Sequence, residues 1–256
     1  MTSRTPPQRT MSANPDELPF WGHLDELRSR LLKSFIAVVV AACFFYPSVD
    51  RFLAFLIRPV GKVVFTSPAD AFVVRLMLLI CGGVVLALPV VVYQLWQFVA
   101  AGLKEDEKKY IRFFAPASFV LFVVGCVFGY WVIIPVGMKF LLSFATESIV
   151  PMITLPNYIS FILTLVLAFG LCFQLPLVLM FLAKIGIVTP AFLVQKRKHA
   201  IVLILIASAV LTPSPDAVSQ ILMAGPLLVL YELGVVASKF MESHGLKPVV
   251  PGGPDS

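Results

Sequence analysis

The stretch FVVRLMLLICGGVVLALPVVVYQLWQF, residues 72–98, contains a single charged residue, Arg75. A helix of this length and composition can cross the roughly 30 Å hydrocarbon core of a bilayer, which needs about 20 apolar residues. The whole chain of 256 residues has the same character, with 59% hydrophobic and 13% charged residues, whereas soluble domains carry about 25% charged residues. These values argue against a soluble domain and predict a polytopic membrane protein.

Long apolar runs recur along the chain and predict an all-α fold with six transmembrane helices. The fifth run is short, because twelve residues form only about 18 Å of helix. Prolines follow it directly, and Pro226 interrupts the sixth run, so we expect short fifth and sixth helices paired as a hairpin. A re-entrant hairpin is the alternative. The expected spans are Leu31–Tyr46, Phe72–Phe98, Ile111–Ile134, Tyr158–Leu182, Ala200–Leu211 and Ala217–Ser238.

Basic residues are distributed unequally between the two sides of these spans. Fifteen lysines and arginines fall in the N-terminal tail, the second-to-third loop, the fourth-to-fifth loop and the C-terminal tail, against five on the other side. The positive-inside rule therefore places both termini in the cytoplasm. We expect one transmembrane domain over residues 1–256, with a core at 18–240 between flexible tails at 1–17 and 241–256.

The remaining composition gives no sign of catalysis or of a cofactor. The net charge of +6 follows from the topology rule and does not indicate a nucleic-acid partner. His23, His199 and His244 are scattered, and the four cysteines lie inside apolar runs without metal-ligand spacing. No zinc-protease, phosphate-loop or nucleophile-elbow motif occurs. We therefore expect a protein that is not an enzyme and holds no cofactor.

The segment Leu18–Lys33 is predicted to form an amphipathic helix that leads into the first span. Leu24, Leu27 and Leu31 recur at helical spacing, while charged residues occupy the other faces. Glu26 stands four residues before Arg30, which is the order of an ordinary helical ion pair. From this segment alone, a solvated helix face is the favoured interpretation of Glu26.

Three consecutive acids, Glu105, Asp106 and Glu107, stand in a loop on the side that is otherwise basic. One interpretation is that they stabilise the start of the third span through its free N–H groups and its dipole. The alternative is a recognition site for a cationic segment, because arginine forms bidentate hydrogen bonds with carboxylates. The spacing does not choose between the two.

Polar residues inside the predicted spans also need a reason, because such groups are costly in a membrane. Gln174 is expected to face the bundle interior or water. Glu232 lies near the cytoplasmic end of the sixth span, where a hydrated position and a proton site are both open. Gly125 and Gly129, four residues apart, would allow close packing of another helix.

Several short segments, taken in order, resemble one family. They are His23–Arg30 (HLDELRSR), Ser67-Pro68 with Asp70–Phe72, Tyr93–Phe98 (YQLWQF), Gly102-Leu103 before Glu107, Phe169-Gly170 through Phe173 to Pro176, Leu211–Pro213 with Pro215-Asp216, and Tyr231-Glu232. With the predicted topology, they make the chain similar to TatC, the polytopic subunit of the twin-arginine protein translocase.

The resemblance implies a concave, glove-like six-helix bundle that binds paired-arginine signal peptides at its cytoplasmic face. By resemblance, Glu26 and Glu107 face the two arginines, and His23, Leu27, Arg28, Phe98 and Leu103 surround them. The resemblance also implies structural roles for the outer-loop residues Pro59, Phe72, Tyr158 and Asp216. The chain departs from the family pattern at Gln174, where Glu is frequent, and at Ala101, where the family has proline.

The partners implied are TatA-type and TatB-type single-span subunits, signal peptides of folded precursors, membrane lipid and further copies of this chain. Export would use the transmembrane proton gradient, in a bacterial cytoplasmic membrane. A small secondary transporter is the rival function, although we find no inverted repeat of the kind such transporters have. An intramembrane enzyme would need a catalytic constellation that the sequence lacks.

Overall fold

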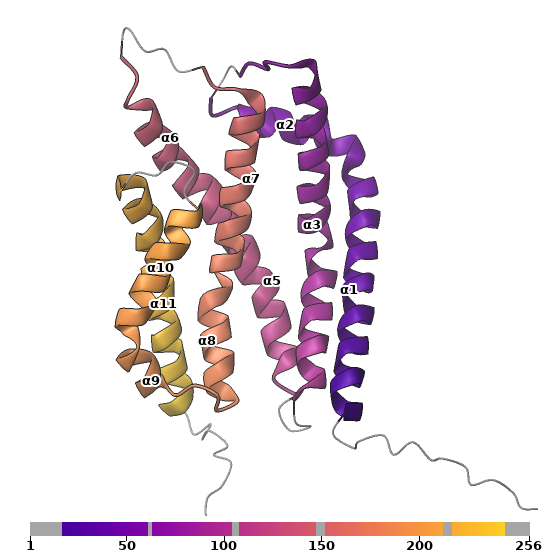
Figure 1. Cartoon of the computed structure of the whole chain (residues 1–256), viewed down its shortest axis with the longest axis vertical. Coiled ribbons are helices and arrows are strands. Elements are labelled where there is room, and N and C mark those ends of the chain that lie inside the picture. Colours follow the sequence, from indigo (N-terminus) through magenta and orange to yellow (C-terminus); the bar gives the residue numbers. More distant parts are fainter. Residues whose placement is uncertain (1–16, 61–62, 104–107, 147–151, 212–216, 244–256) are drawn as a thin grey trace, which may run out of the picture.

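The computed structural model describes residues 17–60, 63–103, 108–146, 152–211 and 217–243, and these residues are almost entirely helical. The all-α prediction is confirmed. Figure 1 shows the helices α1 (Glu17–Phe45), α2 (Val49–Ile57), α3 (Pro68–Ala101), α5 (Ile111–Phe128), α6 (Ile134–Leu142), α7 (Leu155–Cys172), α8 (Gln174–Lys184), α9 (Pro190–Gln195), α10 (Arg197–Leu211) and α11 (Ala217–Ser243).

Within the described ranges, five helical stretches are long and apolar enough to cross a membrane: 22–57, 68–101, 111–142, 155–184 and 223–240. The sixth predicted span corresponds to the last of these. The fifth corresponds to α10, whose 15 residues give about 22 Å of helix at 1.5 Å per residue. The prediction that this span is short is therefore correct.

Two features differ from the expected spans. The helix α11 has 27 residues and continues through Pro226, so the sixth helix is neither short nor interrupted. Transmembrane helices tolerate proline because neighbouring groups can satisfy the freed backbone carbonyl. The fourth span, in contrast, divides at Phe173 into α7 and α8. Pro176 explains this break, because it cannot donate to the carbonyl of Cys172 four residues earlier and its ring crowds that carbonyl.

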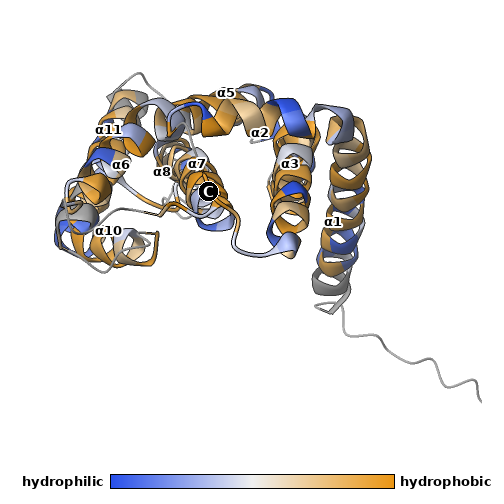
Figure 2. Ribbon diagram, turned by 90° about the horizontal axis from the view of Figure 1, so that it is seen from above, coloured by the Kyte–Doolittle hydropathy of each residue, from blue (hydrophilic) through white to orange (hydrophobic). Residues whose placement is uncertain are grey.

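The helices are arranged as an open, curved row rather than a closed bundle. The neighbours include α1 with α3, α3 with α5 and α7, α5 with α7, α8 with α11, and α11 with α10. Seen from above, α1 lies at one edge of the row and α10 at the other, and most of the ribbon has the colour of hydrophobic residues (Figure 2). The core is centred on α7, where Ile159, Ile162 and Phe169 are at most 1% exposed.

The helices α5 and α7 approach closely at Gly125 and Gly129, as the sequence predicted. A Cβ at Gly125 would lie 2.5 Å from the carbonyl oxygen of Phe169 and 2.9 Å from the Cα of Gly170. Backbone therefore packs against backbone here, which only glycine permits. Gly129 itself begins one π-helical turn, Gly129–Ile133, that leads into α6.

The end of the molecule that carries α2 is joined by contacts between segments far apart in sequence. Val64 and Thr154 form a parallel β-bridge, in which the N–H of Leu155 donates to the carbonyl of Val64 at 2.7 Å. At the start of α3, Ser67 caps the helix and its N–H donates to the Asp70 carboxylate at 3.0 Å. These bonds satisfy backbone groups that a helix end would otherwise leave free.

Candidate functional site

The start of α1 and the end of α3 meet at the end of the molecule opposite α2 (Figure 1). There the ring of His23 stacks on Phe98, with centroids 4.5 Å apart and planes inclined by 27°. The same imidazole lies over the turn that ends α3, because a Cβ at Gly102 would be 3.9 Å from its Cε1. The structure thus brings together two residues that the resemblance placed in one site.

One helical turn further along α1, Glu26 forms the ion pair that its spacing predicted. Its Oε1 accepts a hydrogen bond from the Arg30 guanidinium at 3.2 Å, and the side chains of Glu26 and Arg30 are 31% and 25% exposed. Arg30 donates a second hydrogen bond, 3.0 Å long, to the side-chain oxygen of Gln94 on α3. A guanidinium therefore joins the two helices at the predicted site.

The contact between Arg30 and Gln94 was not predicted from the sequence, because the two residues are 64 positions apart. Gln94 belongs to the YQLWQF segment, but that segment by itself gives no indication of its partner. Only the antiparallel pairing of α1 with α3 brings the two side chains together. Gln94 is therefore an additional candidate residue of this site.

The other predicted members of the site differ in their surroundings. Leu27 and Arg28 are exposed on α1. Leu103 is half-buried and packs against a cluster that includes Trp96, Phe114 and Phe181. Glu107 lies outside the described residues; it directly precedes Lys108, the first described residue after that gap.

A hydrogen-bonded group lies deeper in the bundle and includes Gln174. Its side-chain amide donates to the carbonyl oxygen of Ser118 at 2.9 Å, and the hydroxyl of Ser118 accepts from the buried Trp96 indole at 2.8 Å. The group links α3, α5 and α8. Because an amide N–H donates to the carbonyl, Gln174 makes a bond that an ionised carboxylate at this position could not make.

A buried lysine, Lys184, lies near the predicted site and was also missed by the sequence analysis. It is 8% exposed, and its ammonium group lies 4.6 Å from the ring centroid of Tyr110. Lys109 approaches the same ring at 5.4 Å. Such contacts stabilise a cation by attraction to the aromatic face. The basic loops that indicated topology thus also contain a specific packing contact.

Glu232 is exposed and pairs with Arg197 on α10, with 2.6 Å between the Glu232 Oε2 and the arginine nitrogen. The next residue back, Tyr231, is buried and donates to the carbonyl of Leu193 at 2.8 Å. Both contacts hold α11 against α9 and α10. The structure places Glu232 in an ion pair, not alone in an apolar environment.

The predicted outer-loop residues lie near the end that carries α2. Pro59 is exposed just after α2, and Phe72 in the first turn of α3 is 69% exposed. Tyr158 is buried and donates to the carbonyl of Leu56 at 2.9 Å. Asp216 lies outside the described residues.

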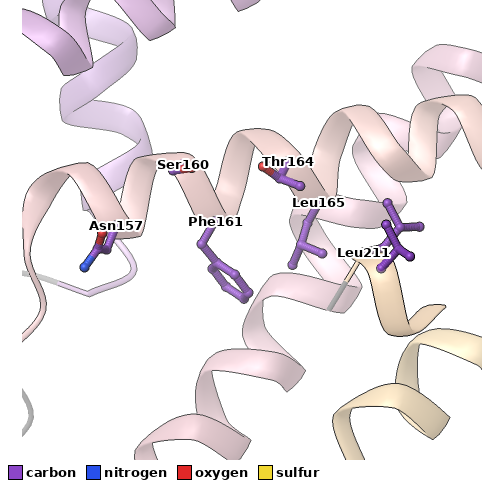
Figure 3. Close-up of a pocket in the computed structure, with 7 residues that line it drawn as sticks. Asn157, Ser160, Phe161, Thr164, Leu165 and Leu211 are labelled. Carbon is purple, nitrogen blue, oxygen red and sulfur yellow. The ribbon is translucent and has the colours of Figure 1, made fainter. Parts of the chain in front are cut away.

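Three polar side chains follow one face of α7 and line a cavity of about 320 Å³: Asn157, Ser160 and Thr164. Figure 3 shows them along a single helix, with Leu211 of α10 across the cavity. Their spacing of three and four residues could have been found in the sequence. Polar groups in a spanning helix usually face protein or water, and here they face this cavity. In the described part of the chain, no three His, Cys, Asp or Glu residues are grouped as metal ligands.

Comparison with known proteins places this geometry in a family context. The family described as "TatC: Sec-independent protein translocase protein (TatC)" matches residues 22–226. The chain is 42% identical to the Sec-independent protein translocase protein TatC of Carboxydothermus hydrogenoformans, over 86% of this chain and 92% of the relative. It is 36% identical to TatCd of Bacillus subtilis, over 86% of this chain and 91% of the relative.

A solved structure shows the same similarity to TatC proteins. A crystal structure of the twin-arginine translocase receptor TatC superposes with a TM-score of 0.77 at 34% identity, covering 85% of this chain and 98% of that chain. The similarity therefore extends over the helical core and is not confined to one motif.

Proposed function

Because the chain belongs to the TatC family of Sec-independent protein translocase proteins, we propose that it binds paired-arginine signal peptides with Glu26 and Glu107. The chain is a multi-pass membrane component of a protein translocase. The rival prediction of a small-solute transporter has no support among its relatives. What is proposed is the peptide site, the partners and the placement in the membrane.

The pairing of Glu26 with Arg30 carries the proposal. This carboxylate already accepts a hydrogen bond from a guanidinium at 3.2 Å, at a partly exposed position. Among the described residues, its second oxygen, Oε2, accepts no hydrogen bond. Since Gln94 also holds Arg30, that arginine stays in place while Oε2 receives a guanidinium from a ligand. The position is therefore suited to an arginine side chain.

Two arginines need a second acid, and Glu107 is the proposed one. Its neighbours in sequence, Leu103 and Lys108, are described at the junction between α3 and α5, beside the end of α3 that packs on α1. The stacked rings of His23 and Phe98 would bound the site between the two acids. Charge-assisted bidentate bonds distinguish arginine from lysine, so the site would recognise both the charge and the planar shape of a guanidinium group.

The proposed task is binding and transport rather than bond chemistry, without a cofactor. The proton gradient would drive export of folded proteins, together with TatA-type and TatB-type single-span subunits and further copies of this chain. We place the protein in a bacterial cytoplasmic membrane as one transmembrane domain, with both termini inside. The excess of basic residues on that side supports this orientation, and the start of α1 and the end of α11 lie at the same end of the molecule (Figure 1).

The test is photo-crosslinking, in membranes, of a signal peptide with a photoreactive residue beside its arginine pair. We compare the wild type with Glu26→Ala and Glu107→Ala, and with Asp25→Ala as a matched control, because Asp25 is exposed beside Glu26 and outside the proposed site. The twin-arginine peptide should crosslink strongly to the wild type and the control and weakly to both glutamate variants.

A twin-lysine peptide serves as the second comparison, because lysine keeps the charge and loses the planar guanidinium. It should crosslink weakly to every variant. Equal crosslinking by the two peptides, or an equal loss in Asp25→Ala, would contradict the proposed site.

A further inference from the structure

A cavity of about 800 Å³ lies between α2, the π-helical turn and α6, toward the end of the molecule opposite the start of α1 (Figure 1). We call it the α2–α6 cavity. Most of its walls are apolar or aromatic, and Tyr130, Trp131 and Met138 are among them. Its size falls within the range of about 300–1,000 Å³ that is typical of small-molecule sites. The α2–α6 cavity is therefore large enough for part of a lipid molecule.

Two basic side chains line this cavity from different elements. Arg58 directly follows α2, and Lys139 lies in the last turn of α6. In the described part of the chain neither forms an ion pair. Arg75, near the same end of the molecule, does pair with an acid, Asp50, at 3.1 Å. The α2–α6 cavity thus combines an apolar interior with two cations that pair with no carboxylate of the described residues.

Helix dipoles explain part of this arrangement, because each cation follows or ends a helix whose C-terminus favours positive charge. Snorkelling of long basic side chains toward water explains another part. Neither accounts for the apolar space that both basic residues line. A ligand with one anionic group and an apolar chain would satisfy both the charges and the space.

The geometry points to an anionic phospholipid as the occupant of the α2–α6 cavity. Its phosphate would lie between Arg58 and Lys139, and the upper part of an acyl chain would lie along Trp131 and Met138. Guanidinium and ammonium groups bind phosphate oxygens by charge-assisted hydrogen bonds, and basic pockets between membrane helices are suited to lipid headgroups. This lipid site is independent of the proposed peptide site, which lies at the other end of the molecule.

Trp131 provides a reporter within the cavity wall. Phospholipids with brominated acyl chains quench tryptophan fluorescence, and subtracting the signal of Trp131→Phe isolates the contribution of this residue. The protein is reconstituted in vesicles that contain brominated phosphatidylglycerol or brominated phosphatidylcholine at equal mole fraction. We expect quenching to show a preference for the anionic lipid on the order of tenfold. In the double variant Arg58→Gln/Lys139→Gln, we expect the two lipids to quench equally.

Arg51→Gln is the matched control, because Arg51 is an exposed arginine of α2 that does not line the cavity. It should keep the full preference. If the double variant does not fold, each single variant should lower the preference about threefold. Equal quenching by both lipids in the wild type would overturn the proposal. An equal loss in Arg51→Gln would also overturn it, because it would show a general surface-charge effect.

Discussion

Glu26 with Arg30 and Glu232 with Arg197 form glutamate–arginine pairs toward the same end of the molecule, and they differ in what they connect. The first pair lies within α1, at 3.2 Å, and its arginine reaches across to Gln94 on α3. The second joins α10 to α11, at 2.6 Å, between more exposed side chains. The same two residue types therefore form a pair within one helix in one region and join two helices of a hairpin in the other.

The difference arises from the number of hydrogen-bond acceptors that hold each arginine. Arg30 is held by two acceptors, so the pair with Glu26 is not the sole contact that fixes its position. In the described part of the chain, Glu232 is the one hydrogen-bond acceptor for Arg197, whose Nε is buried without a partner. We therefore expect removal of Glu26 to affect binding more than stability, and removal of Glu232 to do the opposite.

The largest change in stability should come from the close contact between α5 and α7. Gly125→Ala places a methyl group against the backbone of α7, where the Phe169 carbonyl is 2.5 Å away. We expect a loss of about 2 kcal/mol, because helices packed backbone to backbone must separate. The melting temperature of the purified protein in detergent measures this loss.

Gly225→Ala is the control for Gly125→Ala, because nothing lies within 4 Å of a Cβ at Gly225. It should leave the melting temperature unchanged or raise it slightly, since alanine favours a helix. Equal destabilisation by both substitutions would mean that the contact between α5 and α7 does not limit stability.

A smaller loss is expected when the hairpin pair is broken. Glu232→Gln should destabilise the protein by about 0.5–1 kcal/mol, because nearly half of each side chain is exposed to solvent screening. A double-mutant cycle with Arg197→Gln measures the coupling between the two residues. A coupling of zero would show that the hairpin is held by Tyr231 and apolar packing alone.

Gln94 tests the anchoring of the other pair. In Gln94→Ala, Glu26 is the one acceptor of Arg30 that remains among the described residues. Arg30 can then move and compete with the peptide arginine for the Glu26 carboxylate. We expect the affinity for a twin-arginine peptide to fall about threefold, or about 0.7 kcal/mol, while the melting temperature stays close to that of the wild type. Gln97→Ala on the same helix is the control. An unchanged affinity in Gln94→Ala would remove Gln94 from the site.

The smallest expected effect is the contribution of Glu26 to stability. Within one helix, a glutamate four residues before an arginine contributes about 0.2–0.5 kcal/mol. Glu26→Gln should therefore lower the melting temperature only slightly. A loss as large as that of Gly125→Ala would indicate that Glu26 has a structural role and would weaken its assignment to the peptide site.

The same contrast explains which features could be predicted from the sequence. The pair of Glu26 with Arg30 and the close approach at Gly125 depend on neighbours within one helix or on residue size, and both can be found in the sequence. The contacts of Arg30 with Gln94, Lys184 with Tyr110 and Arg197 with Glu232 depend on how helices pair. No local pattern contains that information.

Prolines show a second reason why prediction is incomplete. Pro226 was expected to interrupt the last helix, and Pro176 was not expected to divide the fourth span. The structure shows a continuous α11 and a break at Phe173. Whether a proline ends a helix depends on which other groups satisfy the freed carbonyl, and that is a property of the packed molecule.

Of the two acids proposed to bind the signal peptide, Glu107 lies outside the described residues, so its predicted position stays a prediction.

The most direct test of the account is the affinity of a twin-arginine signal peptide for the reconstituted protein, compared between Glu26→Gln and Glu232→Gln. Each substitution removes one negative charge from a glutamate–arginine pair while keeping the size of the side chain. We predict that Glu26→Gln weakens binding about tenfold or more, or about 1.4 kcal/mol, and that Glu232→Gln leaves it unchanged. Equal weakening by the two substitutions, or none by Glu26→Gln, would contradict the assignment of peptide binding to the α1–α3 end.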